Sequence, residues 1–231
     1  MSIDLKTSSI SIIIPTLNEA ETVGALLSQL QGIAGVEVIV VDGSSHDGIA
    51  AIVEKSEARL IQTSAGRALQ LNKGAEEARG DILLFLHSDT KLAPGFVEQV
   101  RETLNQPGVS AGAFQLSIDG HGFGLRVIEW LANCRSKVLQ MPYGDQGIFV
   151  STDTFFSVGS FPPQPIMEDF ELMRKLKKKG TVKILSLHAT TSPRRWEKLG
   201  IWKTTLINQA IIIGYFLGIS PEKLAEWYRG E

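Results

Sequence analysis

Short apolar runs alternate with helical patterns through the first part of the chain. The runs predict strands at residues 10–14, 37–41, 60–61 and 82–86, and the stretches between them predict helices at 19–30, 47–55 and 67–78. Strands that are apolar throughout and separated by helices are typical of a parallel sheet covered on both faces. The pattern therefore predicts a doubly wound α/β domain, whose ligands bind beyond the carboxyl ends of the strands.

The pattern loosens after residue 93. It predicts helices at 94–105 and 168–179 and strands at 110–118, 147–150 and 182–187. Residues 110–118 alternate as an antiparallel strand would. We therefore expect the sheet to continue into a mixed second half.

Composition narrows the class of protein. The 231 residues fit one domain, and a net charge of −2 with a pI of about 6.1 favours no nucleic-acid partner. Cys134 is the sole cysteine, which excludes a disulfide framework or a cysteine zinc site within the chain. Together with a polar N-terminus that lacks a signal-peptide pattern, this fits a protein of the reducing cytoplasm.

An apolar run at residues 210–219 is too short to span a bilayer, which takes about 20 residues. We favour a helix packed on the core over one that rests on the inner face of the membrane. A homodimer contact through residues 201–219 is a further alternative.

Polar residues follow three of the predicted strands. Asp42, at the end of the second strand, could accept hydrogen bonds from a base or ribose, and Ser44 adds a hydroxyl two residues later. Asn18, after the first strand, can cap the next helix, and taken alone the 15–19 segment is turn chemistry. Neither a dinucleotide-binding glycine fingerprint nor a Walker A loop is present in the sequence.

A cation and a carboxylate stand where phosphates would bind. Arg67 begins a predicted helix, whose N-terminus favours anions, and Asn72 lies one to two turns further on. The fourth strand ends in His87-Ser88-Asp89, which places His87 and Asp89 on one face. A divalent cation that bridges phosphates needs one or two protein carboxylates, so Asp89 is a candidate metal ligand and His87 a supplementary one.

These motifs occur together in one order. That order is IIIPTLNE, VVDGSSHDG, the 67–74 segment, LFLHSDT, Gly-Ala-Phe at 112–114, YGDQG at 143–147 and Met-Glu-Asp at 167–169. The chain resembles the family 2 inverting glycosyltransferases of the GT-A fold over residues 10–196. It is most similar to a small bacterial subgroup named for arsenosugar biosynthesis, through HSDT, YGDQGIF and SPRRW.

The resemblance implies a single GT-A (Rossmann-like) domain over residues 1–231. Its central, mostly parallel mixed sheet would be flanked by helices. The nucleotide-binding half would cover about 8–110, the acceptor-side half about 111–196, and a C-terminal helical appendage 197–231.

The resemblance also implies roles for single residues. Nucleotide or diphosphate contacts are expected from Pro15, Glu19, Asp42, Ser44, Arg67, Asn72, Ser88, Arg194 and Arg195. Asp89 matches the last aspartate of the family's metal-binding D-x-D, while His87 departs from its first. Acceptor contacts are expected from Tyr143, Asp145, Gln146 and Trp196. Asp169 matches the catalytic base, and its neighbour Glu168 is expected to be catalytic with it, although alone the two are an acidic first helical turn.

We therefore expect a metal-dependent inverting transferase. Mg²⁺ or Mn²⁺ on Asp89 would stabilise a departing nucleoside diphosphate, and Asp169 would take the proton of an acceptor hydroxyl. The donor is expected to be an NDP-sugar, with UDP-sugars favoured, and the acceptor a small or lipid-linked molecule. The rival functions are a nucleotidyltransferase and a non-catalytic module that binds sugar nucleotides or lipid head groups.

Overall fold

Four parallel strands form the amino-terminal side of the sheet. In the computed structural model, which describes residues 7–229, they are β1 (Ile10–Thr16), β2 (Val36–Asp42), β3 (Arg59–Gln62) and β4 (Ile82–Phe85). The helices between them are α1 (Ala20–Leu30), α2 (Ile49–Val53) and α3 (Arg67–Glu77). The predicted succession of strands and helices in this half is confirmed.

The other strands make the sheet mixed. They are β5 (Thr90–Leu92), β6 (Val109–Ile118), β7 (Ile148–Ser151) and β8 (Thr181–Thr191), and the eight strands lie in the order β3-β2-β1-β4-β7-β6-β8-β5. β7 runs antiparallel to both β4 and β6, whereas β6 pairs with β8 in parallel. The antiparallel alternation predicted for 110–118 is therefore correct for only one of its two neighbours.

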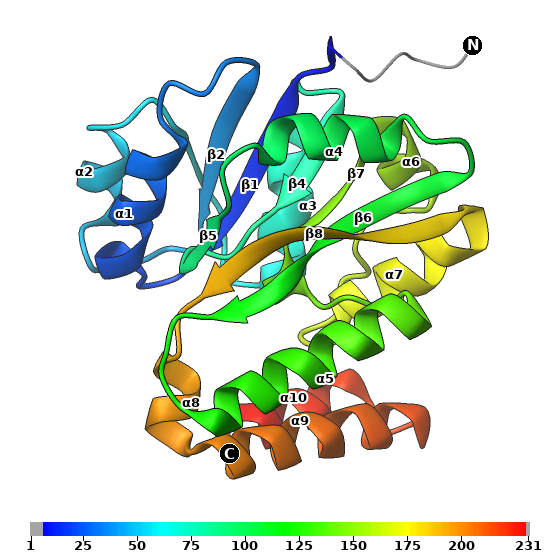
Figure 1. Ribbon diagram of the computed structural model, residues 1–231. Coiled ribbons are helices and arrows are strands. Elements are labelled where there is room, and N and C mark those ends of the chain that lie inside the picture. Colours follow the sequence, from blue (N-terminus) through cyan, green and yellow to red (C-terminus); the bar gives the residue numbers. More distant parts are fainter. Residues whose placement is uncertain (1–6, 230–231) are drawn as a thin grey trace.

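The remaining helices cover the sheet and extend beyond it (Figure 1). They are α4 (Phe96–Leu104), α5 (Phe123–Leu139), α6 (Thr152–Ser157), α7 (Glu168–Lys179), α8 (Arg194–Leu199), α9 (Ile201–Phe216) and α10 (Pro221–Arg229), with a short 3-10 helix, η2 (Gly144–Gln146). Figure 1 shows α5 and α9 running along the base of the molecule.

Alternating side chains of the central strands enter two separate cores. Ile12 and Ile14 of β1 pack with helices α1, α2 and α4, whereas Ile13 packs with α3, α6 and α7. Successive strand side chains point to opposite faces, so strands that are apolar throughout require a cover on both. Gly74 lets α3 approach β1, because a Cβ at this position would collide with Ile13. The 67–74 motif is thus partly a packing motif.

The predicted cap of the first helix is wrong. Asn18 adopts a φ of 54°, and its Oδ1 accepts from the backbone N of His46 instead of from the helix. The N-terminus of α1 is capped from the neighbouring loop, where Asp47 Oδ2 accepts from the backbone N of Ala20 at 2.8 Å. The two strand-end loops are therefore tied together.

The apolar run of 210–219 falls largely in α9. Ile211 and Gly214 of this helix are buried, as expected for packing on the core, but Ile213 and Phe216 are exposed. Within residues 7–229, no helix combines the length and the hydrophobicity that crossing a bilayer requires.

Candidate active site

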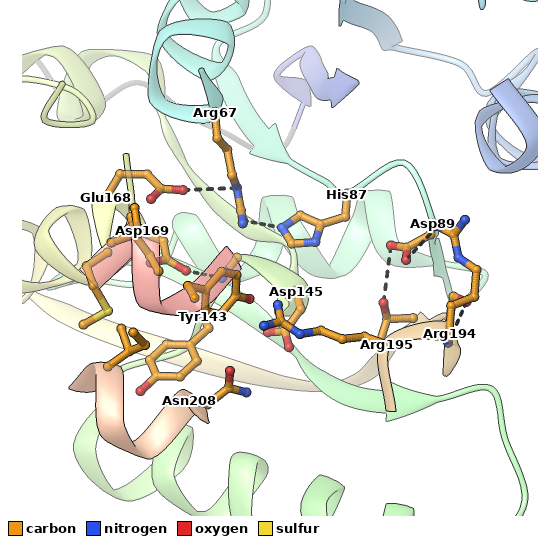
Figure 2. A pocket seen from close by; sticks show the side chains of 18 of the residues that line it. Arg67, His87, Asp89, Tyr143, Asp145, Glu168, Asp169, Arg194, Arg195 and Asn208 are labelled. Carbon is orange, nitrogen blue, oxygen red and sulfur yellow. Dashed lines mark hydrogen bonds and ion pairs between the residues drawn. The ribbon is translucent and has the colours of Figure 1, made fainter. Parts of the chain in front are cut away.

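A cavity of about 920 Å³ lies at the carboxyl end of β4, between the start of α7 and helices α9 and α10. Its polar lining comes mainly from Glu19, Arg67, His87, Asp89, Asp145, Asp169, Arg194 and Arg195, and its apolar lining from Ile166, Met167, Ile211, Ile212, Ala225 and Tyr228. The cavity thus has a charged wall and an apolar wall. Figure 2 shows the charged side chains converging from opposite sides.

Asp89 stands between β4 and β5 in an ion-pair bridge. Its Oδ2 lies 3.5 Å from Nη2 of Arg194, and the same nitrogen lies 3.0 Å from Oε2 of Glu19. Oδ1 receives a long contact of 3.4 Å from the Thr191 hydroxyl of β8. A single guanidinium therefore holds two carboxylates close to each other, and hydrogen bonding to Glu19 raises the pKa of Arg194.

His87 faces Arg67 across the cavity wall. Its Nε2 lies against Nη2 of Arg67, and Nε of Arg67 is 3.1 Å from Oε1 of the buried Glu168. Burial, assisted by the Arg67 charge, lowers the pKa of His87 well below 6.5. The histidine is therefore neutral and presents Nε2 to Arg67. This arrangement does not support the predicted role of His87 as a metal ligand through that nitrogen.

Asp169 and Glu168 play different parts, although we predicted both as catalytic. Burial raises the pKa of Glu168, whose carboxylate is engaged with Arg67. Asp169 lines the cavity, and its two oxygens each accept from a backbone N, that of Gly144 and that of Phe170, both at 2.7 Å. These bonds fix the orientation of the Asp169 carboxylate. A Cβ at Gly144 would lie against Nη2 of Arg67, so any larger residue there would have to displace the guanidinium from its present position.

The 143–146 segment divides between cavity and core. Tyr143 and Asp145 line the cavity, and burial raises the pKa of both groups. Gln146 is fully buried: its Oε1 accepts from Ser136 at 2.6 Å and its Nε2 donates to the Phe114 carbonyl at 3.0 Å. The predicted acceptor contact of Gln146 is therefore wrong, because its amide secures the turn to the core.

Two arginines meet aromatic rings near the cavity. The guanidinium of Arg195 stacks over Tyr228 at 3.8 Å, and burial lowers its pKa. Its buried Nε has no hydrogen-bond partner among residues 7–229. Arg135 lies 3.4 Å over the Tyr143 ring. The sequence analysis missed Arg135, Asn208 and Tyr228, since their patterns are those of ordinary helices.

The donor residues expected after the second strand lie apart from this cavity. Ser44 borders a second hollow of about 400 Å³ together with Ser45, His46, Gln62 and Thr63. Asp42 is buried beside it, and its carboxylate accepts from the backbone N of Ser45 at 3.0 Å. In this arrangement the Asp42 carboxylate binds its own loop, and Ser44 is the predicted donor residue that borders the hollow.

Three further predicted donor residues do not line either hollow. Asn72 exchanges two hydrogen bonds with the backbone of Phe161, at 2.9 and 3.0 Å. Ser88 is buried behind Asp89, and Pro15 is a half-buried residue of β1. The predicted ligand contact of Asn72 is corrected, because its amide is used to hold the loop before α7. Arg194, Arg195 and Trp196, in contrast, are brought to the cavity as predicted.

The carboxylates fit a divalent cation shared with a diphosphate. Among residues 7–229, no group of three or more histidine, cysteine, aspartate or glutamate side chains forms a complete metal cage. Mg²⁺ and similar ions need only one or two protein carboxylates where substrate phosphates supply further oxygens. Asp89 meets that requirement. Glu19 is joined to it through Arg194, whose guanidinium already places a positive charge between them.

Comparison with protein families identifies the chain. Residues 11–161 match the model described as glycosyl transferase family 2. The chain belongs to this family. The chain is similar to an uncharacterised glycosyltransferase of Haemophilus influenzae, with 36% identity over 104 residues that cover 42% of this chain and 35% of the relative. Glycosyltransferase AglE of Haloferax volcanii is 27% identical over 169 residues, covering 66% and 56%.

A third relative has a name that specifies its reaction. The undecaprenyl-phosphate 4-deoxy-4-formamido-L-arabinose transferase of Aeromonas hydrophila is 31% identical over 110 residues, which cover 42% of this chain and 34% of the relative. This chain therefore spans between about a third and just over half of the length of these relatives.

Solved structures confirm the predicted GT-A fold. The mannosyltransferase PcManGT of Pyrobaculum calidifontis, in complex with GDP-Man and Mn²⁺, superposes with a TM-score of 0.68 at 19% identity, covering 96% of this chain and 68% of that one. TarS 1-349 of S. aureus, in complex with UDP, gives 0.61 at 20% identity, covering 86% and 65%. The family 2 chain thus shares their architecture.

Proposed function

We propose that this family 2 chain transfers a sugar, with inversion, from a nucleoside-diphosphate sugar to an acceptor hydroxyl, and that a divalent metal is required. The observation that carries the proposal is the meeting of Asp89, Arg194 and Asp169 in one cavity. A cation site, a phosphate-binding arginine and an oriented carboxylate are the groups that a single displacement needs.

The charged wall suits the diphosphate. Arg194, at the start of α8, lies against Glu19 and Asp89, and Arg67 begins α3. Guanidinium groups bind phosphate through two parallel hydrogen bonds. Asp89, with Glu19 nearby, would hold Mg²⁺ or Mn²⁺, which when bound supplies positive charge for the leaving diphosphate. Arg194 would then turn from the carboxylates to the phosphates.

Asp169 is suited to act as the general base. Its carboxylate is held by backbone N–H groups at the start of α7, faces the cavity and has no arginine partner among the described residues. It could accept the proton of a hydroxyl that attacks the anomeric carbon from the face opposite the diphosphate. Asp145 would hold the acceptor. Glu168 would act as a positioning residue by keeping Arg67 in place.

The apolar wall supports an acceptor with an apolar part. Ile212 of α9 and Tyr228 of α10 border the same cavity as Asp169. A lipid-linked acceptor agrees with this lining, and the Aeromonas relative bears the name of an undecaprenyl-phosphate transferase. UDP is the favoured donor nucleotide, since TarS has been solved with UDP and with UDP-GlcNAc. We also propose membership of the arsenosugar-named subgroup, on its HSDT, YGDQGIF and SPRRW segments.

The test is a screen of radiolabelled UDP- and GDP-sugars with the purified chain in the presence and absence of Mn²⁺. We expect metal-dependent hydrolysis of one donor to free sugar and nucleoside diphosphate. An acceptor pool should speed the release of the nucleoside diphosphate, with the sugar then found on the acceptor. Formation of NTP that requires pyrophosphate would instead identify a nucleotidyltransferase. Donor binding without turnover, with or without acceptors, would identify a binding module.

A further inference from the structure

The outer faces of α5 and α9 expose large apolar side chains. We call this surface the base stripe, and it consists of Phe123, Trp130, Leu131 and Val138 on α5 and Trp202, Leu206, Ile213 and Phe216 on α9. Their exposed fractions run from 50% for Leu131 to 85% for Phe123. Single exposed apolar residues are normal on a protein surface, but a contiguous row of them marks an interaction site.

The spacing of these residues places each row on one side of its helix. Trp202, Leu206 and Ile213 follow one another at intervals of four and seven residues, which correspond to one and two turns. Ile211, on the opposite side of α9, lines the active-site cavity. Because a contiguous row of exposed apolar side chains marks an interaction site, we expect the outer side of α9 to have a cover of its own.

The two helices meet near their N-termini. A Cβ on Gly124, in the first turn of α5, would lie 2.9 Å from Ile201, in the first turn of α9. Ile201 also packs with Leu125 and Ile128 of α5 in a small core of their own. Both helices run along the base of the molecule in Figure 1, away from strand β2.

The exposed charges of α5 and α9 are all positive. They are Arg126 and Lys137 on α5 and Lys203 on α9. The single acid of α5, Glu129, pairs with Arg126 at 3.0 Å and accepts from the backbone N of Ile118 at 2.5 Å, so Lys137 and Lys203 carry the exposed positive charge that this acid does not balance. Lys177 donates to the Leu139 carbonyl at 2.6 Å, which brings the lysine run at the end of α7 to the end of α5.

This charge pattern favours one occupant over another. In a symmetric pair of chains the same patch meets itself, so cations would face cations across the contact, which is unfavourable. An anionic lipid surface offers both an apolar interior for Trp130 and Trp202 and negative head groups for Lys137 and Lys203.

We propose that the base stripe rests in the head-group region of an anionic bilayer. Helices of 17 and 16 residues lie in the plane of such a surface, with their apolar sides immersed and their cations at its edge. The surface is a binding site in its own right, since it requires no sugar donor. It would also bring the α9 wall of the cavity next to the membrane.

The experiment is co-sedimentation of the full chain with vesicles of phosphatidylcholine alone and of phosphatidylcholine mixed with phosphatidylglycerol. Wild-type protein is expected to sediment with the mixed vesicles, less with the neutral ones, and less with either as salt rises. Trp202→Glu is expected to weaken binding by more than about tenfold. Lys203→Gln is expected to weaken binding to the mixed vesicles by about fivefold.

Leu69→Glu is the matched control, because it places the same carboxylate at an exposed leucine of α3, outside the base stripe. It is expected to bind within about twofold of wild type, since a distant charge is screened. Circular dichroism establishes that each variant is folded, and Ile213→Glu repeats the test on α9 should Trp202→Glu fail to fold.

Three results would overturn the proposal. The first is that the wild type does not sediment with mixed vesicles. The second is that Trp202→Glu and Leu69→Glu lose binding equally. The third is that the chain forms a dimer, that Trp202→Glu dissociates it, and that vesicles bind neither protein. Vesicle binding is measured without a donor. Absence of sugar transfer would therefore count against the proposed function and leave this proposal standing.

Discussion

The two walls of the cavity are built on different principles. The charged wall stands on loops at strand ends and is held by ion pairs, of Arg194 with Glu19 and Asp89 and of Arg67 with Glu168. The apolar wall stands on α9 and α10, where Ile212 and Tyr228 face the cavity. Ion pairs fix the position of charge before a ligand arrives, whereas apolar packing accepts varied shapes. Under the proposed function, this difference predicts precise recognition of a diphosphate and broader recognition of an acceptor.

The largest effect should come from the carboxylate between the walls. Asp169→Asn keeps the shape and one acceptor oxygen, which can still bind Gly144 N, but it loses the bond from Phe170 N and cannot take a proton. We expect kcat for transfer to fall by about 100- to 10,000-fold while donor affinity stays unchanged. Single-turnover kinetics and donor titration measure the two quantities. A larger loss in Asp145→Asn than in Asp169→Asn would assign the base to Asp145 instead.

The next effect concerns the charged wall. Arg194→Ala removes the guanidinium expected to bind the diphosphate and leaves Glu19 and Asp89 without their shared cation. We expect kcat/KM for the donor to fall by about 100-fold. Arg174→Ala is the matched control, because this arginine of α7 is exposed and pairs with Glu171 outside the cavity. Equal kinetics for the two variants would remove Arg194 from the site.

A smaller effect should mark the apolar wall. Ile212→Asn places an amide on a half-buried position that lines the cavity. We expect the KM of this variant for the acceptor that the screen identifies to rise about tenfold, because one apolar contact with the acceptor is lost. Donor hydrolysis by the same variant serves as the internal control and should be unchanged. A rise in donor KM alone would show that the apolar wall belongs to the donor site.

The smallest effect concerns the attachment of α9. The Tyr215 hydroxyl donates to Glu171 of α7 at 2.5 Å, and burial, reinforced by this bond, raises the pKa of Tyr215 to about 12. A raised folded-state pKa stabilises the protein below pH 10.0, and this stabilisation is lost as pH rises through about 12. Tyr215→Phe should lower the free energy of unfolding by about 1 kcal/mol at neutral pH.

The alkaline part of that prediction is measured by urea denaturation. The difference in unfolding free energy between wild type and Tyr215→Phe should shrink as the pH rises through about 12. A difference that is constant with pH would mean that the hydroxyl does not titrate as a partner of Glu171.

Two residues of the charged wall could be predicted from local rules, whereas Glu19 and Arg194 were expected only from the family resemblance. A residue that follows a buried strand lies at the ligand-binding edge, so Asp89 and Arg67 could be found from strand and helix positions alone. Helix α7 was predicted with its observed bounds, since its acidic start and lysine-rich end mark both termini.

The apolar wall could not be predicted in this way. Asn208 and Tyr228 reach the cavity only because α9 and α10 fold back beneath it, which no local pattern specifies. The predictions for Gln146 and Asn72 were wrong for a different reason. An amide near a motif looks the same whether it meets a ligand or, as here, secures a loop to the backbone of Phe114 or Phe161. Their hydrogen-bond partners are distant in sequence.

The central claim is that Asp89 holds a divalent ion shared with the donor diphosphate. Its most direct test is calorimetric titration of UDP into wild type and Asp89→Asn, each with and without Mn²⁺. Metal should tighten UDP binding to the wild type, and the coupling should vanish in Asp89→Asn while metal-free affinity stays similar, since linkage between two ligands is reciprocal. Equal Mn²⁺ enhancement in both proteins would contradict the claim.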